Sequence, residues 1–188
     1  MSYKQALSSC ASIVAMALGM GSTAFAQDEA STPKYEIGVN YSWLYVNSSA
    51  NDNQRTGNGG SGYFEYNLNR SWGLVADVGG YANTRKDDRL MTYLFGPRYN
   101  FRFSRWTPYA QALFGGAHLW NGPAYGHNEN GFAAAFGGGV DYRLTNHIAL
   151  KPIQVEYVLT RLDNPNTFGG HQNDIRYSAG VVFRLGSK

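Results

Sequence analysis

The sequence predicts an all-β protein: an eight-stranded antiparallel β-barrel of up-and-down topology that spans a membrane. Three observations lead to this prediction. A targeting segment opens the chain, eight runs of alternating residues follow it, and no charged residue falls on the apolar face of those runs. Alternation with a period of two is the pattern of a strand that has two different faces.

Length and composition limit the class of protein before any motif is considered. The chain has 188 residues, of which 43% are hydrophobic and 15% are charged, with 23 Gly and 14 Tyr. This is material for one domain, and the low charge excludes a coiled coil or a charge-rich disordered chain. The net charge of +3 comes without a basic run, so we expect no binding of nucleic acid.

Residues 1–26 have the form of a secretory signal peptide, which leaves residues 27–188 for the barrel. Lys4 supplies a positive charge, residues 11–20 are apolar, and residues 24–26 (Ala-Phe-Ala) resemble a cleavage site. The apolar run is too short to cross a bilayer as a helix.

The single cysteine, Cys10, lies inside this segment. Cleavage would leave a chain that forms no disulfide and has no thiolate to bind a metal. The alternative, a lipid-modified cysteine, is disfavoured because the apolar run follows Cys10 instead of preceding it.

The first alternating run, from Tyr35 to Tyr45, shows the pattern most clearly. Its odd positions are all apolar or aromatic, whereas its even positions are mostly small or polar. The same reading predicts eight strands, at 35–45, 63–68, 72–79, 91–101, 108–115, 132–144, 148–159 and 174–185. In the seventh run the apolar parity changes near Pro152, which predicts a bulge where a residue without an N–H is tolerated.

The second face of the strands decides which side points inward. A soluble barrel would carry a hydrated outer face rich in Lys, Glu and Thr, but here the polar face is rich in Gly, Ala and Ser. It also carries charges of both signs, which suits a narrow closed interior where side chains pair. We therefore turn the apolar face toward lipid and predict a charge network in the lumen. Its members are Glu36, Glu65, Asp77, Arg98, Asp141, Arg143, Lys151, Glu156 and Arg176, with Asp174 and Arg184 on the same face.

The connections alternate in length, as in outer-membrane barrels. Those after strands 1, 3, 5 and 7 are long and polar, whereas those after strands 2, 4 and 6 are short. This predicts long loops outside the cell and both termini in the periplasm. Aromatic residues near each end would form interfacial girdles. The girdle at the short turns would contain Trp72, Phe101, Phe103, Trp106 and Tyr142, and the one at the long loops Trp43, Tyr45, Tyr81 and Trp120.

Several stretches resemble the small outer-membrane β-barrel proteins of the OmpA-like and OmpX-like kind. They are YNLNRSWGLVADVGGY, TYLFGPRYNFR, TPYAQALFGGAH and PIQVEYVLTR, and the resemblance covers residues 34–186. The end of the chain resembles the signal read by the barrel assembly machinery, with Gly180, Phe183 and Leu185 as its matching residues. The resemblance implies a location in the outer membrane, contact with its lipids and lipopolysaccharide, and a monomer.

A glycine-rich stretch, Gly57–Gly62, has the spacing of a dinucleotide-binding motif. That motif needs a strand before it and a helix after it, so we interpret the match as accidental and the stretch as a loop tip.

Catalysis is the main alternative, since some eight-stranded barrels modify lipid A. Lipid A deacylases carry a His-x-Ser pair on one strand, and none of the four histidines here has that sequence. The histidines are scattered, which predicts no metal site, and we expect no cofactor. A small pore is a further alternative, although eight strands enclose room for side chains more than for water.

The loops are the remaining candidates for function. Arg85, Lys86 and Arg89 could meet lipopolysaccharide phosphates, although Asp87 and Asp88 among them fit a mixed solvated loop equally well. The expected function is therefore non-enzymatic: envelope integrity or surface interaction through four long loops.

Overall fold

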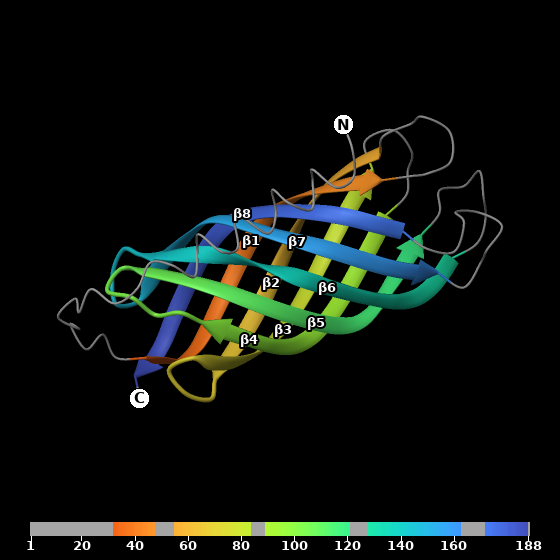
Figure 1. The fold of residues 1–188 in the computed structure, drawn as a ribbon. Helices are drawn as coiled ribbons and strands as arrows, with labels where there is room; N and C mark the ends of the chain where they lie inside the picture. The colour runs from red at the N-terminus through yellow and green to blue at the C-terminus, as the bar shows by residue number, and fades with distance from the viewer. Residues whose placement is uncertain (1–31, 48–54, 84–88, 121–127, 163–171, 188) are drawn as a thin grey trace, which may run out of the picture.

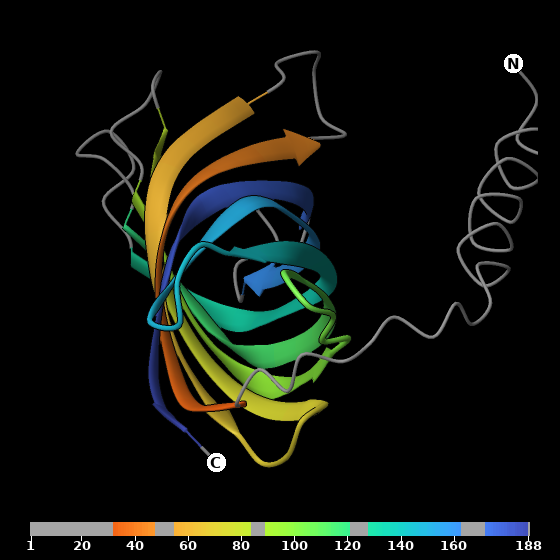
Figure 2. The same cartoon turned by 90° about the vertical axis from the view of Figure 1, so that its left-hand side faces the viewer.

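A single closed sheet of eight antiparallel strands makes up the fold (Figure 1). The computed structural model describes residues 32–47, 55–83, 89–120, 128–162 and 172–187. The strands are β1 (Pro33–Asn47), β2 (Arg55–Asn67), β3 (Trp72–Asn83), β4 (Arg89–Asn100), β5 (Trp106–Trp120), β6 (Asn128–Arg143), β7 (Ile148–Leu162) and β8 (Gln172–Ser187). Each strand pairs with its neighbour in sequence, and β8 pairs with β1 to close the barrel (Figure 2). The predicted fold class is confirmed. No described residue belongs to a helix long and apolar enough to cross a membrane.

The register of the sheet fixes the tilt of the strands. One circuit of cross-strand partners runs from Ile37 through Phe64, Ala76, Phe95, Phe114, Ala134, Leu159 and Asn173 to Asn47. It returns to β1 ten residues beyond its start, since 47 − 37 = 10. Such a stagger over eight strands corresponds to a tilt of roughly 40° from the barrel axis.

Three tight turns join β2 to β3, β4 to β5 and β6 to β7 at one end of the barrel. In the first, Asn69 Oδ1 accepts hydrogen bonds from the backbone N–H of Ser71 and Trp72, at 2.9 and 2.8 Å. In the third, Thr145 Oγ1 accepts from the N–H of His147 and Ile148. Short polar side chains that bond their own backbone favour such turns.

The bulge predicted near Pro152 is present. The β7–β8 register shifts between Lys151 and Gln154, and the β6–β7 register shifts between Val140 and Tyr142. Because of the extra residue, Lys151 and Gln154 both point into the lumen although they are three positions apart, and both are buried.

The prediction of a loop at Gly57–Gly62 is wrong, because β2 begins at Arg55 and this stretch pairs with both β1 and β3. The glycines fit the sheet because large neighbours cover some of them. The ring of Tyr81 on β3 lies against Gly59, where a Cβ would come 2.7 Å from Tyr81 Cδ1. An aromatic ring over a glycine on the adjacent strand compensates for the missing side chain.

We expect the space over Gly38 to be essential for packing. A Cβ there would lie 2.0 Å from the ring of Tyr63, whereas a Cβ at Gly80 on the outer face would meet nothing within 4 Å. Gly38→Ala should lower the free energy of unfolding by about 1–3 kcal/mol. The matched control Gly80→Ala should change it little, because its Cβ enters open space. Denaturant unfolding in micelles, followed by tryptophan fluorescence, measures both variants; equal stabilities would contradict the packing described here.

Candidate functional site

The inward face of the barrel carries a continuous network of ion pairs and hydrogen bonds. Eight of the nine side chains predicted for it are buried, at 6% exposure or less; they are Glu36, Glu65, Asp77, Arg98, Asp141, Lys151, Glu156 and Arg176. Arg143 is half-buried at the short-turn end, and no ion pair joins it to the described members of the network. Asp174 and Arg184 on β8 are buried as well.

The layer nearest the short turns centres on Glu36. Arg102 Nη2 lies 2.9 Å from Glu36 Oε1 and also donates to Asn67 Oδ1 at 2.8 Å. Asn67 Nδ2 donates to Glu36 Oε1 and to the carbonyl oxygen of Pro33. Arg102 belongs to the turn after β4, so this turn closes the short-turn end of the lumen with a charge.

The next layer centres on Arg98 of β4. Its Nη1 lies 2.7 Å from Glu65 Oε2, and its Nε donates to Gln111 Oε1 at 2.8 Å. Its guanidinium also stacks near two rings, with Cζ at 4.7 Å from the Tyr63 centroid and 4.2 Å from that of Tyr109. The Arg98 charge is therefore neutralised by one carboxylate and screened by aromatic faces in a space without bulk water.

Lys151, from the bulged segment of β7, lies beside the same two rings. Its Nζ donates to Tyr109 Oη at 2.8 Å and to Gln154 Oε1 at 3.1 Å, and is 3.7 Å from Asp141 Oδ1. The bulge is what positions this ammonium group against the Arg98 layer.

The third layer centres on Arg176 of β8. Its Nη2 and Nε lie 2.6 and 2.7 Å from Glu156 Oε2, and its Nη1 reaches Asp77 Oδ1 at 3.1 Å and Tyr81 Oη at 2.6 Å. Gln111 joins this layer to the one below, because its Nε2 donates to Glu156 Oε1 at 2.7 Å while its Oε1 accepts from Arg98.

Sequence reasoning missed the neutral members of this network and one cation. These neutral members are buried and have inward parity in the alternation, but nothing in the local sequence marks them as partners of the charges; they are Asn67, Asn100, Gln111 and Gln154. The sequence places Arg102 in a turn, and only the folded turn shows that its side chain reaches inward to Glu36 and Asn67. Tyr81 was predicted for the outer girdle; this is wrong, because Tyr81 is 5% exposed and its hydroxyl binds Arg176. Its odd position on β3 places it on the inward face with Asp77.

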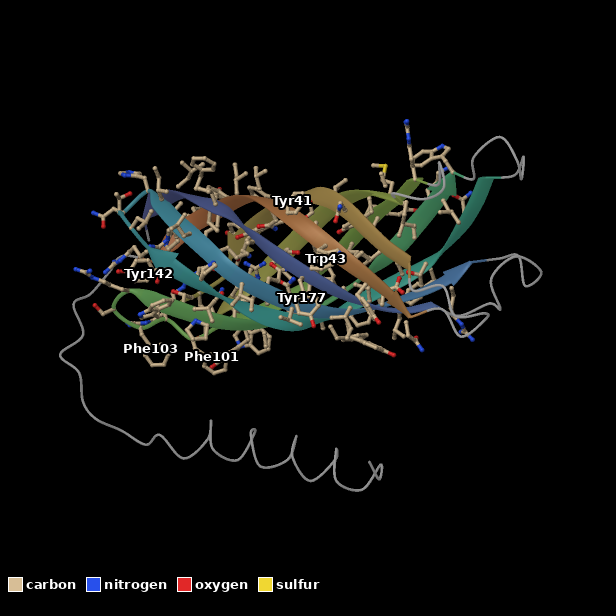
Figure 3. The ribbon with its side chains drawn as sticks, turned by 90° about the horizontal axis from the view of Figure 1, so that it is seen from above. Tyr41, Trp43, Phe101, Phe103, Tyr142 and Tyr177 are labelled. Carbon is tan, nitrogen blue, oxygen red and sulfur yellow. The ribbon has the colours of Figure 1, made fainter. Side chains whose placement is uncertain are left out.

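The outward face is apolar and aromatic over most of its height. Figure 3 shows Phe101, Phe103 and Tyr142 near the short-turn end, and Tyr41, Trp43 and Tyr177 farther along the barrel. Trp72, Phe101, Phe103 and Trp106 are each about half exposed, as the girdle prediction requires. Rings of this belt contact one another, for example Tyr99 with Phe101 at a centroid distance of 4.8 Å. Toward the other end, Trp43 and Trp120 are also exposed.

Chemistry outside the lumen is sparse among the described residues. His118 Nδ1 contacts Asn130 Oδ1 on the outer surface, and this contact includes no hydroxyl or thiol nucleophile. No group of three potential metal ligands occurs in the described parts of the chain.

An apolar exterior, a charged but paired interior and eight tilted antiparallel strands together define a small transmembrane barrel of the outer-membrane type. The chain belongs to the outer membrane protein β-barrel domain family, whose model matches residues 12–187. A search among curated proteins finds no match.

Solved structures agree with this family. Neisserial surface protein A is 17% identical, with a TM-score of 0.69 over 81% of this chain and 97% of its own. The attachment invasion locus protein of Yersinia pestis is 16% identical, with a TM-score of 0.52 over 82% and 99%. The outer membrane protein OprG of Pseudomonas aeruginosa is 11% identical, with a TM-score of 0.53 over 85% and 100%. At these identities the likeness is one of fold.

Proposed function

We propose that this barrel is a non-enzymatic anchor that holds four long connections at the cell surface, where they serve envelope integrity or surface interactions. The observation that carries the proposal is the filled lumen. Side chains of Glu36, Arg98 and Arg176 occupy successive layers of the lumen and bind their partners at 2.6–3.1 Å. The interior side chains therefore hold the strands of the barrel together. The apolar exterior contacts lipid, which leaves the long connections for contact with other molecules.

The names of two structural neighbours refer to the cell surface and to attachment. A surface role for this chain is compatible with them, although the likeness itself extends to the fold alone. The residues of the long connections, 48–54, 84–88, 121–127 and 163–171, lie outside the described residues. Arg85 and Lys86, named above as possible phosphate contacts, are among them.

We also propose how the protein is exported, cleaved and assembled. The signal peptide of residues 1–26 would be removed after export, and the assembly machinery would read Gly180, Phe183 and Leu185 on β8. Phe183 and Leu185 face outward and are each 44% exposed, so they are accessible on the strand that closes the barrel. The barrel would act as a monomer with both termini in the periplasm.

Surface labelling tests which end of the barrel faces the outside of the cell. The single native cysteine lies in the signal peptide, so a cysteine introduced into the mature chain is unique. In intact Gram-negative cells, Asn51→Cys should react with a membrane-impermeant maleimide, whereas the control Asn146→Cys, in the β6–β7 turn, should react only after permeabilisation. The reverse pattern would overturn the proposed display of the long connections.

Replacing residues 48–54 by a Gly-Ser segment of equal length distinguishes the role of this loop from that of the barrel as an anchor. The heat-dependent gel mobility of the barrel should stay unchanged, while detergent resistance or cell adhesion conferred by the wild-type chain is reduced. Residues 55–58 are kept because they belong to β2. Two results would contradict a non-enzymatic, non-conducting role: a change in lipid A mass on expression, or steady single-channel openings in planar bilayers.

A further inference from the structure

Two arginines at the short-turn end of the lumen are enclosed but have no counter-ion. Arg184 of β8 is 8% exposed, and Arg143 at the end of β6 is half-buried. No hydrogen bond or ion pair joins either guanidinium to the part of the chain that the structure describes. By contrast, a carboxylate oxygen lies 2.6–3.7 Å from each of four other lumen cations, Arg98, Arg102, Lys151 and Arg176. We call Arg143 and Arg184 the rim pair.

The rim pair lies at one level of the barrel, which Figure 2 shows from this end. Arg143 is the cross-strand partner of Ala149, which in turn is the partner of Val182. The stagger of the sheet shifts a line of constant height by about 2.5 residues over these two strands, so that line reaches Arg184 instead of Val182. The two backbones are two strand spacings apart, or roughly 10 Å. Ala149 is the inward residue of β7 between them, and it is too short to separate the two side chains.

Positive charge exceeds negative charge at this end of the lumen. Glu36 is the cross-strand partner of Arg184, so their Cβ atoms are about 5 Å apart, but its Oε1 accepts from Arg102 at 2.9 Å. The other nearby carboxylate, Asp141, lies 3.7 Å from the ammonium group of Lys151. These two carboxylates therefore compensate other cations, and the two charges of the rim pair are left over.

The turns around the rim pair fix its backbone and add no negative charge. The N–H of Arg143 donates to the carbonyl oxygen of Arg105, and the N–H of Arg184 donates to that of His147, each at 2.8 Å. The turn residues 101–105 and 144–147 contain no Asp or Glu, and Arg105 is exposed. An anion that approaches from the short-turn side therefore meets only positive or neutral groups in these turns.

We propose that the rim pair is a binding site for a phosphate group. An enclosed cation without a counter-charge is unfavourable, so a bound anion would stabilise the folded barrel. Guanidinium groups bind phosphate through parallel N–H bonds, and a phosphate group carries about 1.5–2 negative charges near neutral pH, which matches the two uncompensated cations. A carboxylate would leave one of them uncompensated. The site lies at the end opposite the long connections, so the inference is independent of what those connections bind.

Isothermal titration calorimetry with inorganic phosphate tests this site, with the processed barrel in micelles of an uncharged detergent and a chloride buffer of constant ionic strength. We expect one saturable site per barrel, and binding of acetate that is weaker by about ten-fold. The double variant Arg143→Gln/Arg184→Gln should bind phosphate about ten-fold more weakly or worse, because it loses charge-assisted hydrogen bonds. The control Arg70→Gln removes an exposed arginine from the β2–β3 turn at the same end and should bind like the wild type.

Denaturant unfolding separates phosphate binding from a structural role of Arg184. Without phosphate, the double variant should be at least as stable as the wild type, because its uncompensated charges are gone. Added phosphate should stabilise the wild type and leave the double variant unchanged. The single variant Arg143→Gln changes only the half-buried position and should already weaken binding, so the proposal stays testable if the double variant does not refold.

Four outcomes of the titration would overturn the site: no saturable binding of phosphate, equal affinity for acetate, unchanged binding in both rim-pair variants, or an equal loss in the Arg70 control. A double variant that is less stable than the wild type without phosphate would also overturn it, because Arg184 would then be a structural partner of Glu36. Phosphatidic acid added to the micelles distinguishes two sources of the group. Competition with inorganic phosphate would assign the site to a lipid headgroup, and its absence would assign it to the free ion; in either case the rim pair holds the phosphate.

Discussion

Replacing Glu65 by Met should lower the free energy of unfolding of the barrel by about 3–5 kcal/mol. Glu65 is fully buried and accepts from Arg98 Nη1 and Asn100 Nδ2, each at 2.7 Å. Without it, the Arg98 guanidinium stays in the lumen with a neutral acceptor on Gln111 and two aromatic faces, and no other carboxylate among the described residues lies at bonding distance. Breaking one partner of a buried pair leaves an uncompensated charge, which is the source of the loss.

The double variant Glu65→Met/Arg98→Met should be more stable than either single variant. Removing both charges also removes the cost of burying them, and methionine fills comparable space. Denaturant titration of the refolded barrels in micelles, followed through the four tryptophans of the chain, supplies the double-mutant cycle. Single losses that simply add in the double variant would show that Glu65 and Arg98 do not act as a pair.

The second large effect concerns the outward face. Phe95 lies midway along β4 with 57% of its surface exposed, between its cross-strand partners Ala76 and Phe114. Phe95→Arg should lower the free energy of unfolding in phospholipid vesicles by about 2–4 kcal/mol, because a cation on the lipid face is most costly at mid-bilayer.

A matched control lies at the edge of the same surface. Phe103 is 65% exposed in the turn after β4, at interface height. Phe103→Arg should change the free energy of unfolding by less than about 1 kcal/mol, because the cost of a cation falls toward the membrane interface. Equal effects at Phe95 and Phe103 would contradict the placement of lipid around the barrel.

Most of the features that could be predicted from the sequence follow from the alternation of apolar and polar residues along the strands. A residue one position along a strand must face the opposite side, so the charges of β4 and β8 were assigned to the lumen without knowledge of any contact. The parity change at Pro152 located the bulge because only an extra residue can move the apolar side from even to odd positions. Both assignments follow from local geometry alone.

Contacts between residues far apart in the sequence determine the features that local sequence patterns could not predict. Gly57–Gly62 has the composition of a loop, but its glycines are strand residues because β1 and β3 flank them and the Tyr81 ring covers Gly59. The pairing of Arg98 with Glu65, and of Arg176 with both Glu156 and Asp77, depends on the register around the whole barrel. No local pattern encodes that register, so membership of the lumen could be predicted but its ion pairs could not.

In this barrel the apolar face of the sheet meets lipid while the charged face is enclosed. Spin labels placed singly at residues 91–96 of β4, in barrels reconstituted into bilayers, test it most directly. We expect accessibility to dissolved oxygen to alternate with a period of two, high at Met91, Tyr93 and Phe95 and low at Thr92, Leu94 and Gly96. The opposite phase, or a strand whose apolar positions are shielded from both oxygen and lipid, would mean that the sheet is folded the other way round, with its apolar face as an internal core.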